Sequence, residues 1–310
     1  MKIYQGLTDF HPPKNAVVTS GTFDGVHLGH QKILNRLQEL AKSKGGETVL
    51  LTYWPHPRLV LQPKNNTLRL LSTFSEKVSI LDEMGIDHLL VLPFTQEFSQ
   101  MSSEDFISKI LVEKIQTKTL VIGYDHRFGK NREGSFEYLQ SHSELYGFEL
   151  EEISRQDVDE LGVSSTKIRL ALAQGDIHTA SKYLGRSYSL SGLVVKGQQI
   201  GRSIGFPTAN IQVEDPYKLL PREGAYAVYV DINRQRYRAM LNIGDRPTVE
   251  GSEKTIEAHI IDFQGDLYGL ELTLFFEAYL REEKRFTSLD ALKNQLMIDR
   301  EQAIFILKKI

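Results

Sequence analysis

Hydrophobic residues follow two different spacings in the two halves of the chain. In the first half, short apolar runs predict buried strands, and apolar residues three or four positions apart predict helices between them. The expected strands are residues 17–19, 48–54, 89–94, 119–122 and 148–153, and the expected helices are one that ends at Gly45 and those at residues 74–84, 102–115 and 135–146. Apolar strands that alternate with helices are typical of a parallel sheet covered by helices on both faces.

The second half has the alternating pattern of half-buried strands. Beyond residues 184–186 the helical spacing disappears, and glycine-containing turns separate the expected strands at residues 188–196, 226–232, 237–242, 255–261 and 270–279. This arrangement predicts a small antiparallel barrel or sandwich. A last helix, residues 288–307, has one apolar side that is expected to pack against the barrel. That side consists of Leu289, Leu292, Leu296, Ala303, Ile304 and Leu307.

Length and composition predict a soluble globular protein with two domains, which we place at residues 1–185 and 186–310. The net charge of −3 argues against a nucleic-acid-binding surface. The absence of cysteine excludes disulfides, thiolate catalysis and cysteine-based zinc sites, and it fits a cytoplasmic location. No apolar run approaches the roughly 20 residues that span a bilayer, so we expect no membrane partner.

The loop between the first strand and the first helix is a candidate nucleotide site. Its sequence, GTFDGVHLGH at residues 21–30, puts His27, Gly29 and His30 at the start of the helix. A helix N-terminus that follows a strand binds anions, because its free N–H groups and the helix dipole point outward. The spacing fits neither the common dinucleotide pattern nor the P-loop pattern. The alternative is that a histidine near a turn only caps the helix or lies at the surface.

Two further loops follow later strands of the predicted sheet. His56 follows the second strand, and Asp125 lies in the sequence GYDHRFG at residues 123–129. Ligands of such sheets bind beyond the carboxyl ends of the strands. We therefore expect both residues near the nucleotide, although Asp125 and Arg127 have the alternative of a simple ion pair within the loop.

Hydroxyl and cationic residues begin the helix that follows residue 163. Ser164, Ser165 and Thr166 precede Arg169. Capping explains one of the hydroxyl residues, but a cation in the first turn is unfavourable unless an anion lies nearby. This combination predicts triphosphate binding.

The sequence GRSIGFPTAN at residues 201–210 predicts a second nucleotide site. Glycines at positions 197, 201 and 205 let a loop approach a ligand closely. The side-chain oxygens of Thr208 and Asn210 suffice as protein ligands for Mg²⁺ when ATP phosphates supply the others. The alternative is a glycine- and proline-containing turn between two strands.

A carboxylate in a later strand is a candidate general base for this second site. Glu257 and His259 share one face of the strand expected at residues 255–261, and the apolar residues share the other face. The alternative is that Glu257 only faces solvent.

These motifs resemble those of a known enzyme family. GTFDGVHLGH is similar to the H-x-G-H signature of nucleotidylyltransferases and, in its full form, to the FAD synthetase module of bacterial riboflavin biosynthesis enzymes. GRSIGFPTAN, NIG at residues 242–244 and EAHI at residues 257–260 resemble the riboflavin kinase module. The resemblance covers nearly the whole chain. It implies a Rossmann-like α/β nucleotidylyltransferase domain, followed by a small antiparallel β-barrel with a C-terminal helix.

The resemblance also implies the reactions and the residues that perform them. ATP phosphorylates riboflavin to FMN with Glu257 as the base, and a second ATP adenylylates FMN to FAD with the help of His27 and His30. The ATP site for adenylylation is expected to contain Gly21, Phe23, Asp24, Gly29, His56, Asp125, Ser164, Ser165, Thr166 and Arg169. The ATP site of the kinase is expected to contain Gly197, Gly201, Arg202, Gly205, Pro207, Thr208 and Asn210, the last two as ligands of the Mg²⁺ cofactor. Arg281 and Glu282 are candidate flavin contacts.

Three alternative functions stay open on the sequence. They are a chain with only one active half, a flavin- or nucleotide-sensing regulator on an inactive scaffold, and a nucleic-acid-binding barrel. Intact motifs in both halves argue against the first, and the presence of both histidines and Glu257 argues against the second. The net negative charge argues against the third, as does the lack of a strand face that combines basic and aromatic residues. The sequence leaves protein partners open, including assembly of identical chains.

Overall fold

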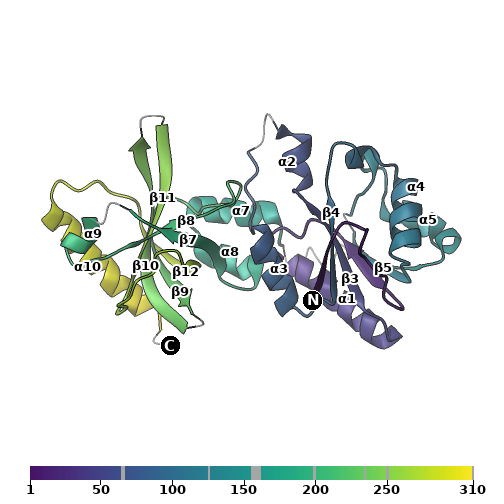
Figure 1. Cartoon of the computed structure of the whole chain (residues 1–310), viewed down its shortest axis with the longest axis horizontal. Coiled ribbons are helices and arrows are strands. Elements are labelled where there is room, and N and C mark those ends of the chain that lie inside the picture. Colours follow the sequence, from purple (N-terminus) through teal and green to yellow (C-terminus); the bar gives the residue numbers. More distant parts are fainter. Residues whose placement is uncertain are drawn as a thin grey trace. The chain divides into compact units, whose positions relative to one another are not determined.

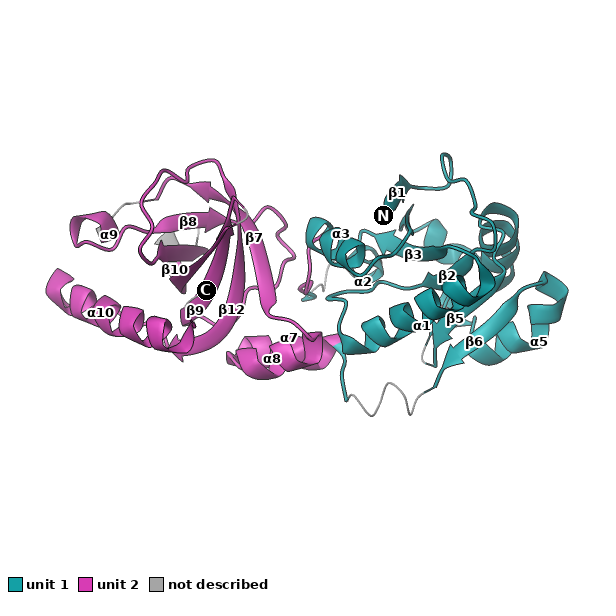
Figure 2. Cartoon of the chain, turned by 90° about the horizontal axis from the view of Figure 1, so that it is seen from below, with its two compact units in different colours: residues 1–68, 74–164 teal, residues 69–73, 165–310 magenta. Residues whose placement is uncertain are grey.

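The computed structural model describes residues 1–63, 67–124, 126–154, 162–197, 200–233, 235–248 and 251–308. The chain forms two compact units, shown in different colours in Figure 2. Unit 1 comprises residues 1–68 and 74–164, and unit 2 comprises residues 69–73 and 165–310. The units therefore separate earlier in the chain than residue 185, and the predicted domain boundary at residues 185 and 186 stays a prediction.

Unit 1 is built on a parallel sheet, of which β3, β4 and β5 are labelled in Figure 1. The sheet has six strands in the order β1-β4-β3-β2-β5-β6. The strands are β1 (Lys2–Gln5), β2 (Val17–Ser20), β3 (Thr48–Trp54), β4 (His88–Pro93), β5 (Thr119–Gly123) and β6 (Glu149–Ile153). The central strands are almost wholly buried, as expected where helices cover both faces. The predicted parallel sheet is confirmed. The sequence does not predict β1, because this short edge strand is polar and largely exposed.

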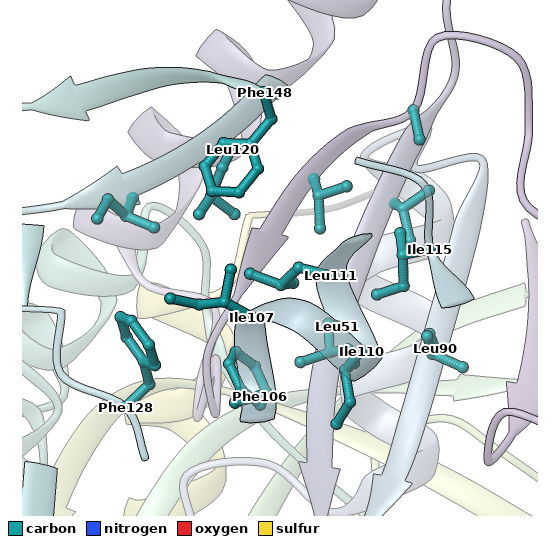
Figure 3. Packing of buried hydrophobic residues seen from close by; sticks show 14 of the residues in the cluster. Leu51, Leu90, Phe106, Ile107, Ile110, Leu111, Ile115, Leu120, Phe128 and Phe148 are labelled. Atoms are coloured by element: carbon teal, nitrogen blue, oxygen red, sulfur yellow. The ribbon is translucent and has the colours of Figure 1, made fainter. Parts of the chain in front are cut away.

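Helices cover both faces of this sheet. The helical segments are α1 (Leu28–Lys44), α2 (Pro57–Leu61), α3 (Phe74–Glu83), η2 (Phe98–Gln100), α4 (Ser103–Asp105), η3 (Phe106–Lys114), η4 (Lys130–Arg132) and α5 (Phe136–Tyr146). Helices α1 and α3 pack on one face, where Leu50 belongs to their apolar cluster. The π-helix η3 packs on the opposite face with Leu51, the next residue of β3 (Figure 3). Leu139 of helix α5 belongs to the same cluster. Because successive strand residues point to opposite faces, the two clusters lie on either side of the sheet.

Unit 2 is a closed antiparallel barrel with the strand order β10-β11-β8-β7-β12-β9. Its strands are β7 (Tyr188–Val195), β8 (Ala209–Gln212), β9 (Gly224–Ile232), β10 (Gln235–Thr248), β11 (Gly251–Ile260) and β12 (Glu271–Arg281), and its helices are α7 (Ser165–Gln174), α8 (Ile177–Leu184), α9 (Ile200–Ser203) and α10 (Leu289–Ile306). The predicted barrel and C-terminal helix are confirmed. Within the described ranges, no helix is long and apolar enough to cross a membrane.

Helix α10 packs against the barrel along only part of the predicted apolar side. Ala303 and Leu307 are buried in a cluster with Phe206 and Met240, and Leu296 packs against it. Leu289, in the first turn of the helix, is 55% exposed, so its predicted packing is wrong. The apolar contact of α10 with this cluster begins only at Leu296.

A buried ion pair joins α10 to β12. Arg281 Nη2 lies 2.7 Å from Oδ2 of Asp299, whose side chain is 2% exposed. We expect Asp299→Ala to lower the free energy of unfolding by about 3–5 kcal/mol, because it leaves the guanidinium without a counter-ion. Denaturant titration checks this. The matched control, Asp231→Ala, removes the carboxylate of an exposed pair with Arg236 and should cost less than about 1 kcal/mol. Equal losses in the two variants would contradict the assignment of Asp299 as a structural anchor.

Candidate active sites

The two histidines of the β2–α1 loop lie face to face at the start of α1. Their ring centroids are 3.7 Å apart, and the ring planes differ by 13°. The backbone N–H of His30 donates to Nδ1 of His27, which is the N-cap of α1. Capping is therefore one role of His27. Because Nδ1 accepts, a neutral His27 ring carries its proton on Nε2, where it is a hydrogen-bond donor.

The loop that leads to these histidines has an unusual backbone. Phe23 and Val26 have φ values of 46° and 39°, which lie in the left-handed region that residues other than glycine rarely adopt. The Phe23 ring lies 5.0 Å from the His30 ring and also packs over Gly21, where an added Cβ would come within 3.1 Å of it. Asp24 is buried in the same loop, and Gly29 is buried in the first turn of α1. Such backbone strain persists only where neighbouring groups hold it, and it is common at functional sites.

A buried lysine beside this loop was missed by the sequence reasoning. Lys77 lies on α3 and is 3% exposed, and its Nζ is 3.3 Å from both the Thr22 carbonyl oxygen and Thr52 Oγ1. Burial lowers the pKa of Lys77 to about 8, and the charge of Asp24 partly opposes this shift. The only signal in the sequence is a lysine among the apolar positions of a predicted helix.

The other predicted loops of unit 1 also follow strand ends. His56 caps α2, since its Nδ1 accepts from the N–H of Arg58 at 3.2 Å. His126 lies 3.1 Å from Ser20 Oγ at the end of β2 and stacks on Phe128 at 5.8 Å, so it packs as an aromatic side chain would. Asp125 lies outside the described residues, and its predicted role stays a prediction.

The predicted triphosphate residues divide between the two units. Ser164 ends unit 1, whereas Ser165, Thr166 and Arg169 belong to α7 of unit 2. Arg169 Nε donates to the Arg69 carbonyl oxygen at 2.7 Å. The grouping of these residues with His27 and His30 stays a prediction.

In the barrel, the structure brings Glu257 together with the residues predicted to bind Mg²⁺. The Thr208 hydroxyl donates to Glu257 Oε2 at 3.2 Å. Asn210 on β8 is directly opposite Glu257 on β11, and Asn242 on β10 is opposite it on the other side. Glu257 is half-buried, while Ile256 and Ala258 point into the barrel interior. This part of the barrel thus brings hydroxyl, amide and carboxylate side chains together on neighbouring strands.

The glycines of the predicted second loop are required by close packing. A Cβ at Gly197 would lie 2.1 Å from Nδ2 of Asn210, and a Cβ at Gly201 would lie 2.2 Å from the Phe206 carbonyl oxygen. Gly205 has a φ of 88°, which favours glycine. Glycine at position 197 therefore leaves room for the Asn210 side chain, and glycine at position 201 leaves room for the Phe206 carbonyl.

A pocket of about 590 Å³ opens beside Thr208. Its lining includes Arg202, Pro207, Thr208, Phe263, Asp266 and Tyr268. The neighbouring His259 donates from Nδ1 to the Pro207 carbonyl oxygen at 2.8 Å, and burial lowers the pKa of His259. His259 thus holds the loop as a neutral donor, and the pocket is large enough for part of a nucleotide.

The two candidate flavin contacts have structural partners. The Arg281 guanidinium is bound by Asp299, and Glu282 forms an ion pair with Arg222. Their role in flavin binding stays a prediction.

Comparisons with known proteins cover both halves of the chain. One family model, FAD synthetase, matches residues 9–167, and another, riboflavin kinase, matches residues 184–307. Proteins from Pseudomonas fluorescens and Escherichia coli, both named bifunctional riboflavin kinase/FMN adenylyltransferase, are 39% and 38% identical to the chain, with 96% of each chain covered. A crystal structure of a Streptococcus pneumoniae protein described as a macrolide-efflux protein has a TM-score of 0.89 and 30% identity, and it covers 98% of this chain and 99% of its own. The chain therefore belongs to the family of bifunctional riboflavin kinase/FMN adenylyltransferases.

Proposed function

We propose that the chain makes FAD from riboflavin in two steps that use two ATP molecules. The observation that supports this is the order of the two family models along one chain, each with its own cluster of polar side chains. Riboflavin kinase activity belongs to the segment with Thr208, Asn210 and Glu257. FMN adenylyltransferase activity belongs to the segment with His27 and His30. The absence of cysteine supports a cytoplasmic location as part of this proposal.

In the kinase step, the riboflavin 5′-hydroxyl oxygen attacks the γ-phosphorus of ATP, and ADP leaves. Glu257 accepts the hydroxyl proton as the new P–O bond forms. The Thr208 hydroxyl holds the carboxylate in place through its 3.2 Å hydrogen bond. Phosphoryl transfer depends mainly on positioning and on neutralising charge, so few protein groups are needed.

The side-chain oxygens near Glu257 are of the type that binds Mg²⁺, and the ion would enter the site together with ATP. Among residues that the structure describes, no group of three or more His, Asp or Glu is arranged to hold a metal by itself. Mg²⁺ commonly keeps one or two protein ligands and takes the rest from water and substrate phosphates. Thr208 and Asn210 would hold it, and it would neutralise phosphate charge when bound.

We expect Asn210→Ala to raise the Mg²⁺ concentration needed for half-maximal riboflavin phosphorylation by about 10-fold or more. The physical reason is the loss of one neutral oxygen ligand. A Mg²⁺ titration at saturating ATP and riboflavin measures the effect. Gln212→Ala, two residues further along the same strand β8, is the matched control and should leave the Mg²⁺ requirement unchanged. An unchanged requirement in the Asn210 variant would remove Asn210 from the metal site.

In the adenylylation step, a phosphate oxygen of FMN attacks the α-phosphorus of ATP, and pyrophosphate leaves. The FMN phosphate is already a nucleophile, so no covalent enzyme intermediate is required. His27 and His30 donate to the phosphate oxygens, where negative charge develops in the transition state. Ser165, Thr166 and Arg169 would stabilise the departing pyrophosphate.

One assay tests the proposal as a whole. The full chain is incubated with riboflavin, ATP and Mg²⁺, and FMN and FAD are separated by chromatography. Formation of both products supports the two activities. Formation of FMN alone, or formation of FAD only when FMN is supplied, would mean that only one half of the chain is active. Flavin or nucleotide binding without turnover would favour the sensing regulator instead.

A further inference from the structure

Lys77 is a buried ammonium group in unit 1 that neither reaction step uses. A lysine is almost never fully buried unless it is paired, because its charge loses hydration. Lys77 is 3% exposed, and its Nζ contacts the Thr22 carbonyl oxygen and Thr52 Oγ1, both at 3.3 Å. Its Nζ also lies 5.2 Å from the centre of the Trp54 ring, within cation–π distance. These neutral groups and Asp24 compensate the buried charge only in part, since the pKa of Lys77 is still lowered to about 8.

The ammonium is bound to the strained part of the nucleotide loop. Thr22, whose carbonyl it holds, immediately precedes Phe23 with its φ of 46°. Asp24, which is 5% exposed, follows Phe23 and attracts the same ammonium. A backbone conformation of this strained kind persists only where surrounding contacts fix it. Lys77 is therefore linked to the loop on both sides of its strained residue.

We propose that Lys77 is a positioning residue of the adenylyltransferase site, whose ammonium fixes the Thr22 carbonyl and the strained loop that leads to His27. This inference rests on the proposed function, in which the loop holds ATP. Thr52, at the carboxyl-terminal part of β3, supplies the second partner and ties the ammonium to the sheet. Lys77 itself touches neither ATP nor FMN in this role.

The charge state of Lys77 makes the proposal sensitive to pH. Asp24 is the charged group that acts on its ammonium, while Thr22, Thr52 and Trp54 are neutral. Above about pH 8 the folded protein loses this proton, so adenylylation should fall. The unfolded chain keeps the proton up to pH 10.5. Because the unfolded state then binds more protons, this lysine's contribution to stability rises over the same interval. Activity and stability thus move in opposite directions, which a purely structural role would not produce.

The test compares the two activities of the full chain between about pH 6.5 and pH 10, a range around the lowered pKa. FMN adenylylation is measured from FMN and ATP, and riboflavin phosphorylation is measured in parallel. In the wild type, kcat/KM for adenylylation should fall with an apparent pKa near 8, and the kinase should lack this decrease. The wild-type profile needs no variant, so it tests the proposal even if a substitution impairs folding.

Two substitutions separate charge from shape. Lys77→Met should lower adenylylation about 100-fold, the scale of a small misplacement of reacting groups, and should abolish the alkaline decrease that depends on Lys77. Lys77→Arg keeps a cation, so it should recover part of the rate and move the decrease to higher pH. Lys218→Met removes an equally buried lysine from unit 2, where Nζ donates to the carbonyl oxygens of Leu71 and Ser189, and should leave the adenylylation profile unchanged.

Three outcomes would overturn the proposal for Lys77. One is a wild-type adenylylation rate that is constant through pH 8. Another is a Lys77→Met variant with the wild-type rate. The third is an equal loss of both activities in that variant. A wild-type chain that forms no FAD from FMN and ATP at any pH would instead contradict the proposed function.

Discussion

Replacing Glu257 with glutamine is expected to lower riboflavin phosphorylation by about 10²–10⁴-fold, the usual contribution of a general base. The amide keeps the shape of the side chain and can still accept from Thr208, but it cannot take the proton of the riboflavin hydroxyl. FMN adenylylation should be unchanged, because His27 and His30 belong to the other unit. Both rates are measured on the same preparation, with riboflavin and ATP for one and FMN and ATP for the other.

The matched control for this variant is Glu277→Gln. Glu277 is also a half-buried glutamate on a barrel strand, where Oε1 accepts from the Ser187 hydroxyl at 2.6 Å. This variant should keep the kinase rate. If Glu257→Gln retains the wild-type kinase rate, Glu257 is not the base. If both glutamine variants lose activity equally, the loss reflects damage to the barrel.

The regular strands and helices could be predicted because burial imposes a period on the sequence. In β11, the predicted buried residues Ile256, Ala258 and Ile260 are 4%, 1% and 7% exposed, and Glu257 lies on the other face. Two short elements were missed for different reasons. Strand β8 is only four residues long and directly follows Thr208, so it looked like the end of a turn. Helix α8 was missed although it ends in a glycine C-cap, a signal that was available in the sequence.

The candidate sites depended on contacts between residues that are distant in sequence. Glu257 meets Thr208 only because β8 pairs with β11, a pairing that periodicity does not reveal. The family resemblance linked these residues before the structure did. Neither the periodicity nor the family resemblance indicated Lys77. Its contacts with Thr22 and Thr52 require α3 to pack beside the loop. The ion pair of Arg281 with Asp299 was not predicted either, and the flavin contact of Arg281 stays a prediction.

The unit boundary has a similar physical explanation. Hydrophobic spacing changes after Leu184, where helices give way to strands, and the predicted boundary followed that change. Packing divides the chain earlier, since α7 and α8 belong to the same unit as the barrel. One contact of this kind is the backbone hydrogen bond of 2.9 Å from Arg222 to Leu172 in α7. A change of secondary structure and a boundary between compact units are therefore different features of this chain.

Loss of the His30 imidazole is expected to lower FAD formation about 10²–10³-fold, as for the removal of one preorganised donor to a phosphate transition state. In a reaction started with riboflavin, FMN should then accumulate, because the kinase site lies in unit 2. The variant is His30→Ala, and the products are followed by chromatography over time.

His27 needs a different substitution, because it also caps α1. Asparagine is among the best N-cap residues, so His27→Asn should preserve the helix start while it removes the imidazole donor. We expect adenylylation to fall as in the His30 variant, with little change in thermal unfolding. His142→Ala removes another histidine of unit 1, stacked on Tyr138 at 4.5 Å, and should keep both activities. Full adenylylation by His27→Asn would mean that His27 serves only as a cap. A parallel loss of kinase activity in either variant would mean that the substitution disturbs the whole chain.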